Sequence, residues 1–293
     1  MHAPVNGALS SEISIVQSAE RLAENQKFSE SLTLLRSLSL DAWGELLWQM
    51  PNPIFPILSS LLPKMSSREV QQSWTGSSDQ QLLNETVAFV RYALSSLGLE
   101  SAEMYSARVL DYGCGYGRIS RLMLKYFPFE NLYGADPWQQ SLDLAWEAGF
   151  KSNYVLTDEV PDDLPFEKAS FSLIWAFSVF THLSPEVGFR SIQTLARYLK
   201  SDGSLVITLR PIEYWDLRTD ITADKLDYLK NSHTSSGQAF LPHDRVPSEK
   251  WGIVYGDTSI SLKKLEKNIG PLKIKEVSGS VLDKYQTYVT LSF

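Results

Sequence analysis

The chain has 293 residues, of which 43% are hydrophobic and 21% are charged. This balance provides enough apolar material for a sizeable core, and it excludes collagen-like and wholly disordered chains. The single cysteine, Cys114, excludes an internal disulfide framework and a metal site built on several cysteines. A net charge of −7 without a Lys/Arg cluster argues against nucleic acid as the substrate, because phosphate contacts supply most of the affinity of nucleic-acid-binding proteins.

The longest nearly unbroken apolar run, residues 171–180, has about half the length that a membrane span needs, so no membrane association is expected. The first residues lack a basic start followed by an apolar segment. We therefore expect no signal peptide and a cytoplasmic location, while the oligomeric state is not indicated.

Residues 1–76 read as helices joined by proline-rich breaks. Helical apolar spacing occurs at residues 13–23 and 30–40. Prolines then interrupt the pattern at Pro51, Pro53, Pro56 and Pro63. This part is expected to be a small helical cap that does not fold alone, followed by a second domain over residues 77–293.

From residue 79 onward, helix and strand patterns alternate. Strands are expected at residues 108–111, 131–135, 153–156, 171–177 and 205–209. Helices are expected at residues 79–97, 118–127, 141–148, 184–200 and 262–269. Such alternation predicts a parallel sheet with helices on both faces. The last two expected strands, residues 272–277 and 286–292, are separated by too short a connection for a crossover and should pair antiparallel.

Residues 211–250 break this rhythm. The stretch is polar, contains two of the four histidines, and is long for a connection. We predict an insertion that serves as a lid or as an acceptor-binding element.

The strongest chemical signal is a glycine-rich turn between a strand and a helix, Val109-Leu110-Asp111-Tyr112-Gly113-Cys114-Gly115-Tyr116-Gly117-Arg118. Alternating glycines allow positive φ angles and a close approach of the backbone to a ligand. A dinucleotide site would require the spacing G-x-G-x-x-G. Neither register fits, because the third glycine position falls on Arg118 or Ser120.

The spacing acid-x-G-x-G-x-G resembles the cofactor motif of the class I S-adenosylmethionine (SAM) dependent methyltransferases. The resemblance continues through residues 164–166, 171–175 and 203–207, and covers roughly residues 79–293 apart from the insertion. It implies an α/β fold with a Rossmann-like, seven-stranded, mostly parallel sheet whose last strand is antiparallel, here with the N-terminal helical cap. It also implies SAM as the cofactor.

The candidate cofactor residues lie at strand ends, where ligands bind in open α/β sheets. Asp111 suits the cationic part of SAM, and Asp136 can accept hydrogen bonds from the ribose hydroxyls. On the resemblance, Asp158 accepts from the adenine amino group and Trp74 lies over the cofactor. The glycines of the cradle are Gly113, Gly115 and Gly117. The structural alternatives are that the first two acids cap turns or helices and that Asp158 is a surface acid.

The implied reaction is an in-line displacement in which the acceptor attacks the methyl group of the sulfonium. His182 follows the fourth strand, where this fold places acceptors, and is the candidate general base. Its structural alternative is a hydrogen-bonded histidine before a helix, and His233 and His243 are rival bases. The dispersed histidines and the lone cysteine give no metal-binding spacing.

Arg210 ends the fifth strand and either holds an anionic acceptor or pairs with Glu213 or Asp216. The predicted function is methyl transfer from SAM to a small-molecule or sugar-type acceptor. Two alternatives stay open: an NAD(P)-dependent Rossmann oxidoreductase, and a non-catalytic binding protein with the methyltransferase fold.

Overall fold

The structure is a computed structural model that describes residues 7–150, 153–244, 250–280, 282–283 and 285–293. Contacts divide the chain into two compact units. Unit 1 consists of Met1–Arg91, Leu99–Ser106 and Cys114–Leu156. Unit 2 consists of Tyr92–Gly98, Ala107–Gly113 and Thr157–Phe293. The domain boundary expected after residue 76 stays a prediction.

Unit 1 begins with four helices, α1 (Ala8–Glu24), α2 (Phe28–Leu35), α3 (Leu40–Trp48) and α4 (Pro56–Leu61). The helix expected at residues 30–40 is divided between α2 and α3, because the Ser39 side chain accepts a hydrogen bond from the N–H of Ala42 and starts a new helix. Trp43 of α3 is fully buried, and its indole N–H donates to the Arg121 carbonyl (3.3 Å). The N-terminal helices therefore share a core with a later helix of the same unit.

The rest of unit 1 alternates helices with two strands. The helices are α5 (Arg68–Thr75), α7 (Ser101–Ser106), α8 (Arg118–Met123), the 3-10 helix η1 (Phe129–Asn131) and α9 (Gln139–Ala148). Helix α6 (Asp79–Ser95) belongs to this unit up to Arg91, and its last residues belong to unit 2. Strands β2 (Leu132–Asp136) and β3 (Tyr154–Leu156) pair in parallel. Gly134 of β2 is required by packing, since a Cβ there would lie 2.6 Å from the ring of Tyr154.

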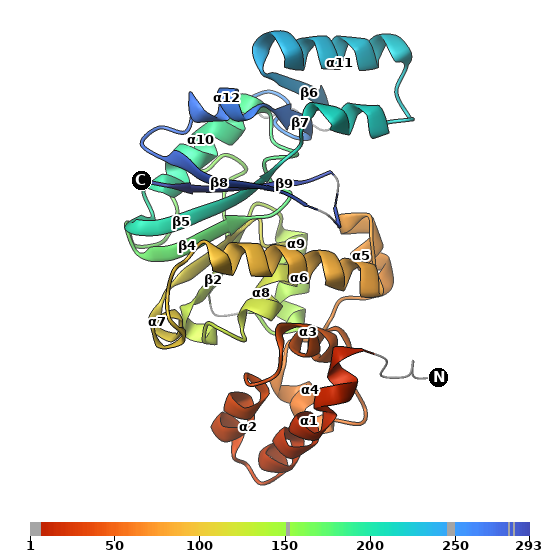
Figure 1. The fold of residues 1–293 in the computed structure, drawn as a ribbon, viewed down its shortest axis with the longest axis vertical. Helices are drawn as coiled ribbons and strands as arrows, with labels where there is room; N and C mark the ends of the chain where they lie inside the picture. The colour runs from red at the N-terminus through yellow and green to blue at the C-terminus, as the bar shows by residue number, and fades with distance from the viewer. Residues whose placement is uncertain (1–6, 151–152, 245–249, 281, 284) are drawn as a thin grey trace. The chain divides into compact units, whose positions relative to one another are not determined.

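Unit 2 contains the larger share of the sheet. Strands β1 (Val109–Tyr112), β4 (Phe171–Ala176) and β5 (Leu199–Leu209) are parallel. Strand β9 (Thr287–Ser292) runs antiparallel to β5, and β8 (Lys273–Gly279) runs antiparallel to β9. Figure 1 shows these last strands side by side. Helices α10 (Pro185–Ala196) and α12 (Leu262–Glu266) complete this part.

The seven strands follow the order β3-β2-β1-β4-β5-β9-β8. This order confirms the predicted Rossmann-like α/β fold with a seven-stranded, mostly parallel sheet and an antiparallel last strand. All six residues of β4 are buried, as expected for a central strand covered on both faces.

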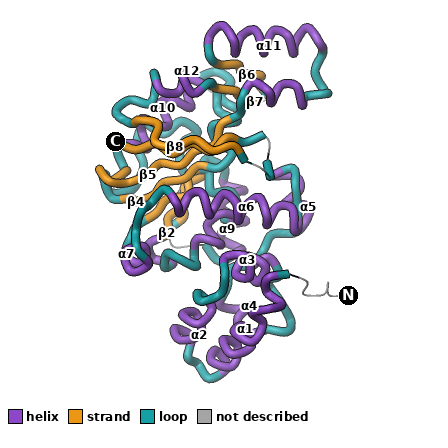
Figure 2. Tube along the Cα trace, viewed as in Figure 1, coloured by secondary structure: helices purple, strands orange, loops and turns teal. Residues whose placement is uncertain are grey.

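The insertion is a folded element in its described part. It contains the 3-10 helix η2 (Ile212–Leu217), α11 (Ala223–Ser236) and β6 (Gln238–Pro242), and β6 pairs antiparallel with β7 (Gly256–Ile260). Figure 2 shows α11 beside this two-stranded sheet. A small core of its own holds it together, formed by Tyr214, Trp215, Leu229 and Ala239. Strand β7, the partner of β6, lies beyond residue 250, the predicted end of the insertion, whose bounds stay a prediction.

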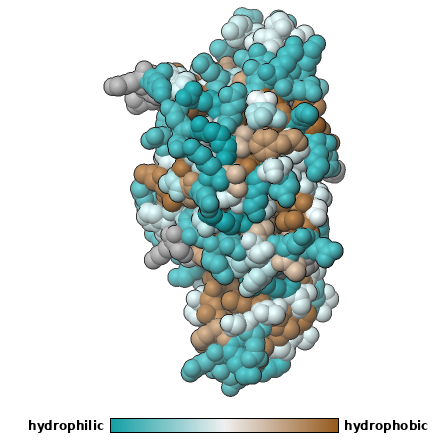
Figure 3. Space-filling model, turned by 90° about the vertical axis from the view of Figure 1, so that its left-hand side faces the viewer, coloured by the Kyte–Doolittle hydropathy of each residue, from teal (hydrophilic) through white to brown (hydrophobic). Residues whose placement is uncertain are grey.

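The face drawn in Figure 3 is largely hydrophilic, with hydrophobic side chains in separate patches. Among the described residues, no helix is both long enough and apolar enough to cross a membrane.

Candidate functional site

The glycine-rich turn adopts the backbone that its sequence predicts. Gly113, Gly115 and Gly117 have φ angles of 74°, 51° and 77°, in the left-handed region that favours glycine. Within unit 1, the Gly117 N–H donates to the Cys114 carbonyl (2.9 Å), and the Cys114 N–H donates to the Ala135 carbonyl of β2 (3.2 Å). The turn is thereby fixed against the end of β2.

Asp136, the last residue of β2, is joined directly to this turn. Its Oδ2 accepts from the Gly115 N–H (2.9 Å), and its Oδ1 accepts from the Trp138 N–H (2.9 Å). Burial raises the pKa of the Asp136 carboxyl, and these two backbone hydrogen bonds oppose that shift. A carboxylate has about four lone-pair sites, so beside these two N–H groups and the neighbouring Ser141 hydroxyl it can still accept a hydroxyl from a ligand. The helix-capping alternative thus accounts only for Oδ1 of Asp136, because Oδ2 binds the glycine turn.

An aromatic group borders the same turn in unit 1. Trp74, near the end of α5, makes edge-to-face contacts with Tyr116 and Trp138, each with ring centroids 6.2 Å apart. Its ring also lies 4.0 Å from the position that a Cβ on Gly115 would occupy. The structure therefore brings together three of the predicted cofactor residues, Trp74, Gly115 and Asp136.

The other predicted cofactor residues belong to unit 2, except Gly117. Asp111 is buried near the end of β1, and Asp158 is exposed. Gly113 is required by packing as well as by its φ angle, since a Cβ there would lie 2.4 Å from the Val179 side chain. Their assignments to SAM rest on the motif and stay predictions.

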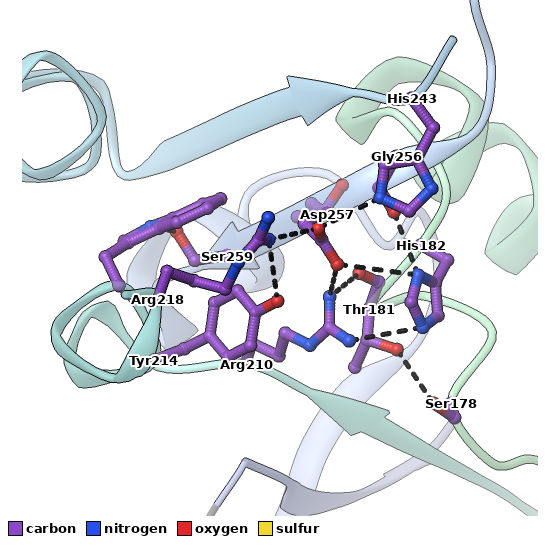
Figure 4. Close-up of polar contacts among 12 residues, drawn as sticks. Ser178, Thr181, His182, Arg210, Tyr214, Arg218, His243, Gly256, Asp257 and Ser259 are labelled. Carbon is purple, nitrogen blue, oxygen red and sulfur yellow. Dashed lines mark hydrogen bonds and ion pairs between the residues drawn. The ribbon is translucent and has the colours of Figure 1, made fainter. Parts of the chain in front are cut away.

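His182 lies in a polar cluster of unit 2 that Figure 4 shows. Its Nδ1 is 2.9 Å from the Gly256 carbonyl, and its Nε2 is 3.1 Å from a terminal nitrogen of Arg210. Nδ1 must therefore carry the proton, and Nε2 accepts from the guanidinium. Burial, together with the Arg210 cation, lowers the pKa of His182 to about 4. The imidazole is consequently neutral at pH 7.

The centre of this cluster is Asp257 on β7. Its carboxylate accepts hydrogen bonds from Arg210, Arg218 and His243 (Figure 4). Burial alone would raise the pKa of this carboxyl, but Arg210 and the neighbouring cationic and histidine groups hold it well below its usual value. The expected pairing of Arg210 with Glu213 or Asp216 is wrong, because Asp257 is its partner.

The sequence gives no motif for Asp257. Its position depends on backbone pairing between the end of the insertion and the segment after β4. The Gly256 N–H donates to the His182 carbonyl (2.8 Å), and the Thr258 N–H donates to the Thr181 carbonyl (2.9 Å). The local feature that distinguishes Asp257 is seen in the structure: it is an acidic residue in a strand whose five residues are all buried.

The rival bases have different surroundings. His233 is buried in α11, and its Nδ1 is 2.7 Å from the hydroxyl of Ser259, which also accepts from the indole N–H of Trp215 (2.7 Å). Burial lowers the pKa of His233. His243 is held by Asp257. Among the described residues, no group of three His, Cys, Asp or Glu side chains could hold a metal ion.

Part of the chain is similar to known methyltransferases. Residues 110–207, about a third of the chain, match the model of a methyltransferase domain. The chain is 29% identical over 100 residues to malonyl-(acyl-carrier protein) O-methyltransferase of Herminiimonas arsenicoxydans, covering 34% of this chain and 36% of that protein. It is 30% identical over 105 residues to an uncharacterized methyltransferase of Schizosaccharomyces pombe, covering 33% and 37% respectively.

These matches span little more than a third of the length of either relative. The solved structure of the PH0226 protein of Pyrococcus horikoshii is 12% identical, with a TM-score of 0.53, and the comparison covers 78% of this chain and 99% of that one. At this identity the likeness shows a common fold.

Proposed function

We propose that residues 110–207, which match the model of a methyltransferase domain, belong to a domain of the class I SAM-dependent type, and that the whole chain is an enzyme that transfers a methyl group from SAM to a small-molecule or sugar-type acceptor. One observation carries the proposal: the glycine turn is bonded through the Gly115 N–H to the Asp136 carboxylate. This contact joins a turn with glycine at every second position to an acid that can still accept a hydrogen bond.

The residues of unit 1 fit the chemistry of SAM. A ribose offers two hydroxyl donors, and Asp136 offers carboxylate oxygens beside a glycine that leaves room for the ligand. SAM carries no phosphate, so this site needs no group that neutralises one. Trp74 and Trp138 offer flat apolar surfaces for an adenine or a sulfonium. Asp111, Gly113 and Gly117 are assigned to SAM by the motif, and Asp158 is assigned to it by the family resemblance.

When bound, SAM supplies a methyl group already activated for in-line displacement. The chain therefore has to position the reactants and exclude water. Asp136 would fix the ribose, and Trp74 would shield the adenosyl group from solvent.

We assign the acceptor's proton to His182. Its neutral imidazole is the form that can take a proton, although its Nε2 must first leave the Arg210 hydrogen bond. A base with so low a pKa is weak. It is sufficient for a hydroxyl acceptor, because the hydroxyl becomes strongly acidic as its oxygen takes up the methyl group.

A calorimetric titration tests the proposal. SAM and its product S-adenosylhomocysteine should bind at one site per chain, and NADH should not bind. Tight binding of NADH would favour the oxidoreductase alternative instead. If neither SAM nor S-adenosylhomocysteine bound, the methyltransferase proposal would be wrong.

A further inference from the structure

We propose that the acceptor that binds beside His182 is uncharged, because the protein's own Asp257 carboxylate fills the anion-binding position formed by Arg210 and Arg218. The inference rests on the proposed function and adds the chemical class of its acceptor. The relevant contacts join the hairpin formed by β6 and β7 of the insertion to the segment that follows β4.

The two arginines converge on one carboxylate. Arg210 binds Oδ1 of Asp257, and Arg218 and His243 bind Oδ2. The Asp257 side chain is only 6% exposed. Two guanidinium groups around a buried anion form the arrangement by which proteins bind carboxylates and phosphates. Here a side chain of the protein itself is the anion.

Most of the remaining donors of the two arginines are also in use. Arg218 binds both oxygens of Asp220 at 2.7 Å, and also donates to the Tyr214 hydroxyl (3.2 Å). Arg210 donates to the Thr181 carbonyl (2.8 Å) and to His182. The Arg210 guanidinium also lies 4.1 Å from the centre of the Tyr214 ring. An incoming anion would find few free donors.

The charges of the cluster cancel. The cations Arg210 and Arg218 face the anions Asp257 and Asp220, and His182 is neutral. The net charge of −7 on the whole chain adds no attraction for anions. Among the described residues, the cluster therefore offers few free donors and no net positive charge to a phosphate or a carboxylate.

The Asp257 carboxylate cannot easily leave. Asp257 pairs with Leu241 in the two-stranded sheet, and the residues on either side of it donate backbone hydrogen bonds to Thr181 and His182. Rotating the acid out would leave the buried Arg210 cation without an anionic partner, which is strongly unfavourable. We therefore treat the filled position as permanent.

Two buried polar atoms nearby suit a neutral ligand. In the part of the chain that the structure describes, Nε of Arg210 and Oε1 of Gln286 have no hydrogen-bond partner. Arg210 follows β5 and Gln286 precedes β9, at the end where Leu209 and Thr287 are register partners. One atom is a donor and the other an acceptor, which matches an uncharged group such as a hydroxyl.

The experiment uses inorganic phosphate as the probe and the imidazole signals of His182 and His243 in nitrogen-15 NMR as the readout. Phosphate is titrated at constant ionic strength into the wild type, Asp257→Asn and Asp220→Asn. We expect no saturable shift in the wild type. Asp257→Asn should show saturable phosphate binding, at least about tenfold tighter than any detected in the wild type, because it removes the negative charge that neutralises the two guanidinium groups.

Asp220→Asn changes an exposed acid, so it serves as the decisive variant if Asp257→Asn fails to fold. It frees one edge of Arg218 and should also gain phosphate binding. Saturable phosphate binding by the wild type, or no gain in any folded variant, would overturn the inference. Titrating S-adenosylhomocysteine into the same samples separates the two ideas, since its failure to bind would count against the proposed function and not against the phosphate result.

Discussion

Replacing Asp136 with asparagine should weaken cofactor binding while leaving the shape of the site almost unchanged. The asparagine retains one oxygen, which can satisfy the N–H of Gly115 or of Trp138 but not both. It also removes the negative charge that would accept the ribose hydroxyls. A hydrogen bond to a charged group contributes about 1.5–3 kcal/mol, and about 1.4 kcal/mol corresponds to a factor of ten in affinity. We therefore expect S-adenosylhomocysteine to bind about 10- to 100-fold more weakly.

The matched control is Asp143→Asn, an identical change at an exposed position of α9. Calorimetry should give wild-type affinity for this variant. Burial raises the pKa of the Asp136 carboxyl. As the pH is lowered, the affinity of the wild type for S-adenosylhomocysteine should therefore begin to fall at a higher pH than it would if the carboxyl were exposed. The reasoning is refuted if Asp136→Asn binds S-adenosylhomocysteine within about twofold of the wild type.

Three further predictions concern single side chains. Trp74→Ala should weaken S-adenosylhomocysteine binding about three- to tenfold by calorimetry, and Trp74→Phe should restore most of it; equal affinities in all three proteins would exclude Trp74 from the site. Gly117→Ala should lower the free energy of unfolding, measured in urea, by about 2–4 kcal/mol, because its Cβ would lie 2.8 Å from the Phe150 ring. Gly76 has a similar φ and open space around it, so Gly76→Ala should cost only about 1 kcal/mol. Equal losses in the two variants would contradict the packing argument. The pKa of His182 is lower in the folded protein than in the unfolded chain. The wild type should therefore lose stability, relative to His182→Gln, as the pH falls from about 6.5 to about 4. Parallel curves of stability against pH for the two proteins would show that the imidazole is not held neutral.

Much of the fold could be predicted because it depends on local patterns. The alternation of strands and helices, and the short connection before β9, indicated the mixed sheet that the structure contains. The glycine spacing indicated the positive φ angles at Gly113, Gly115 and Gly117. Asp136 could be placed near the turn because carboxyl ends of neighbouring parallel strands share one edge.

The parts that could not be predicted depend on contacts between distant segments. Helix α11 buries only Leu229 and His233, so its sequence has almost no apolar stripe. The Asp257 partner of Arg210 lies 47 positions further along the chain. No spacing rule connects these two residues, because the hairpin of the insertion is held in place by backbone hydrogen bonds that any sequence can form.

The most direct measurement is a crystal structure of the protein with S-adenosylhomocysteine bound. We expect both ribose hydroxyls to donate to the Asp136 carboxylate and the ligand to pass over Gly115 beside Trp74. Density for the ligand elsewhere, with the Asp136 carboxylate making only its two backbone contacts, would contradict the assignment of this site.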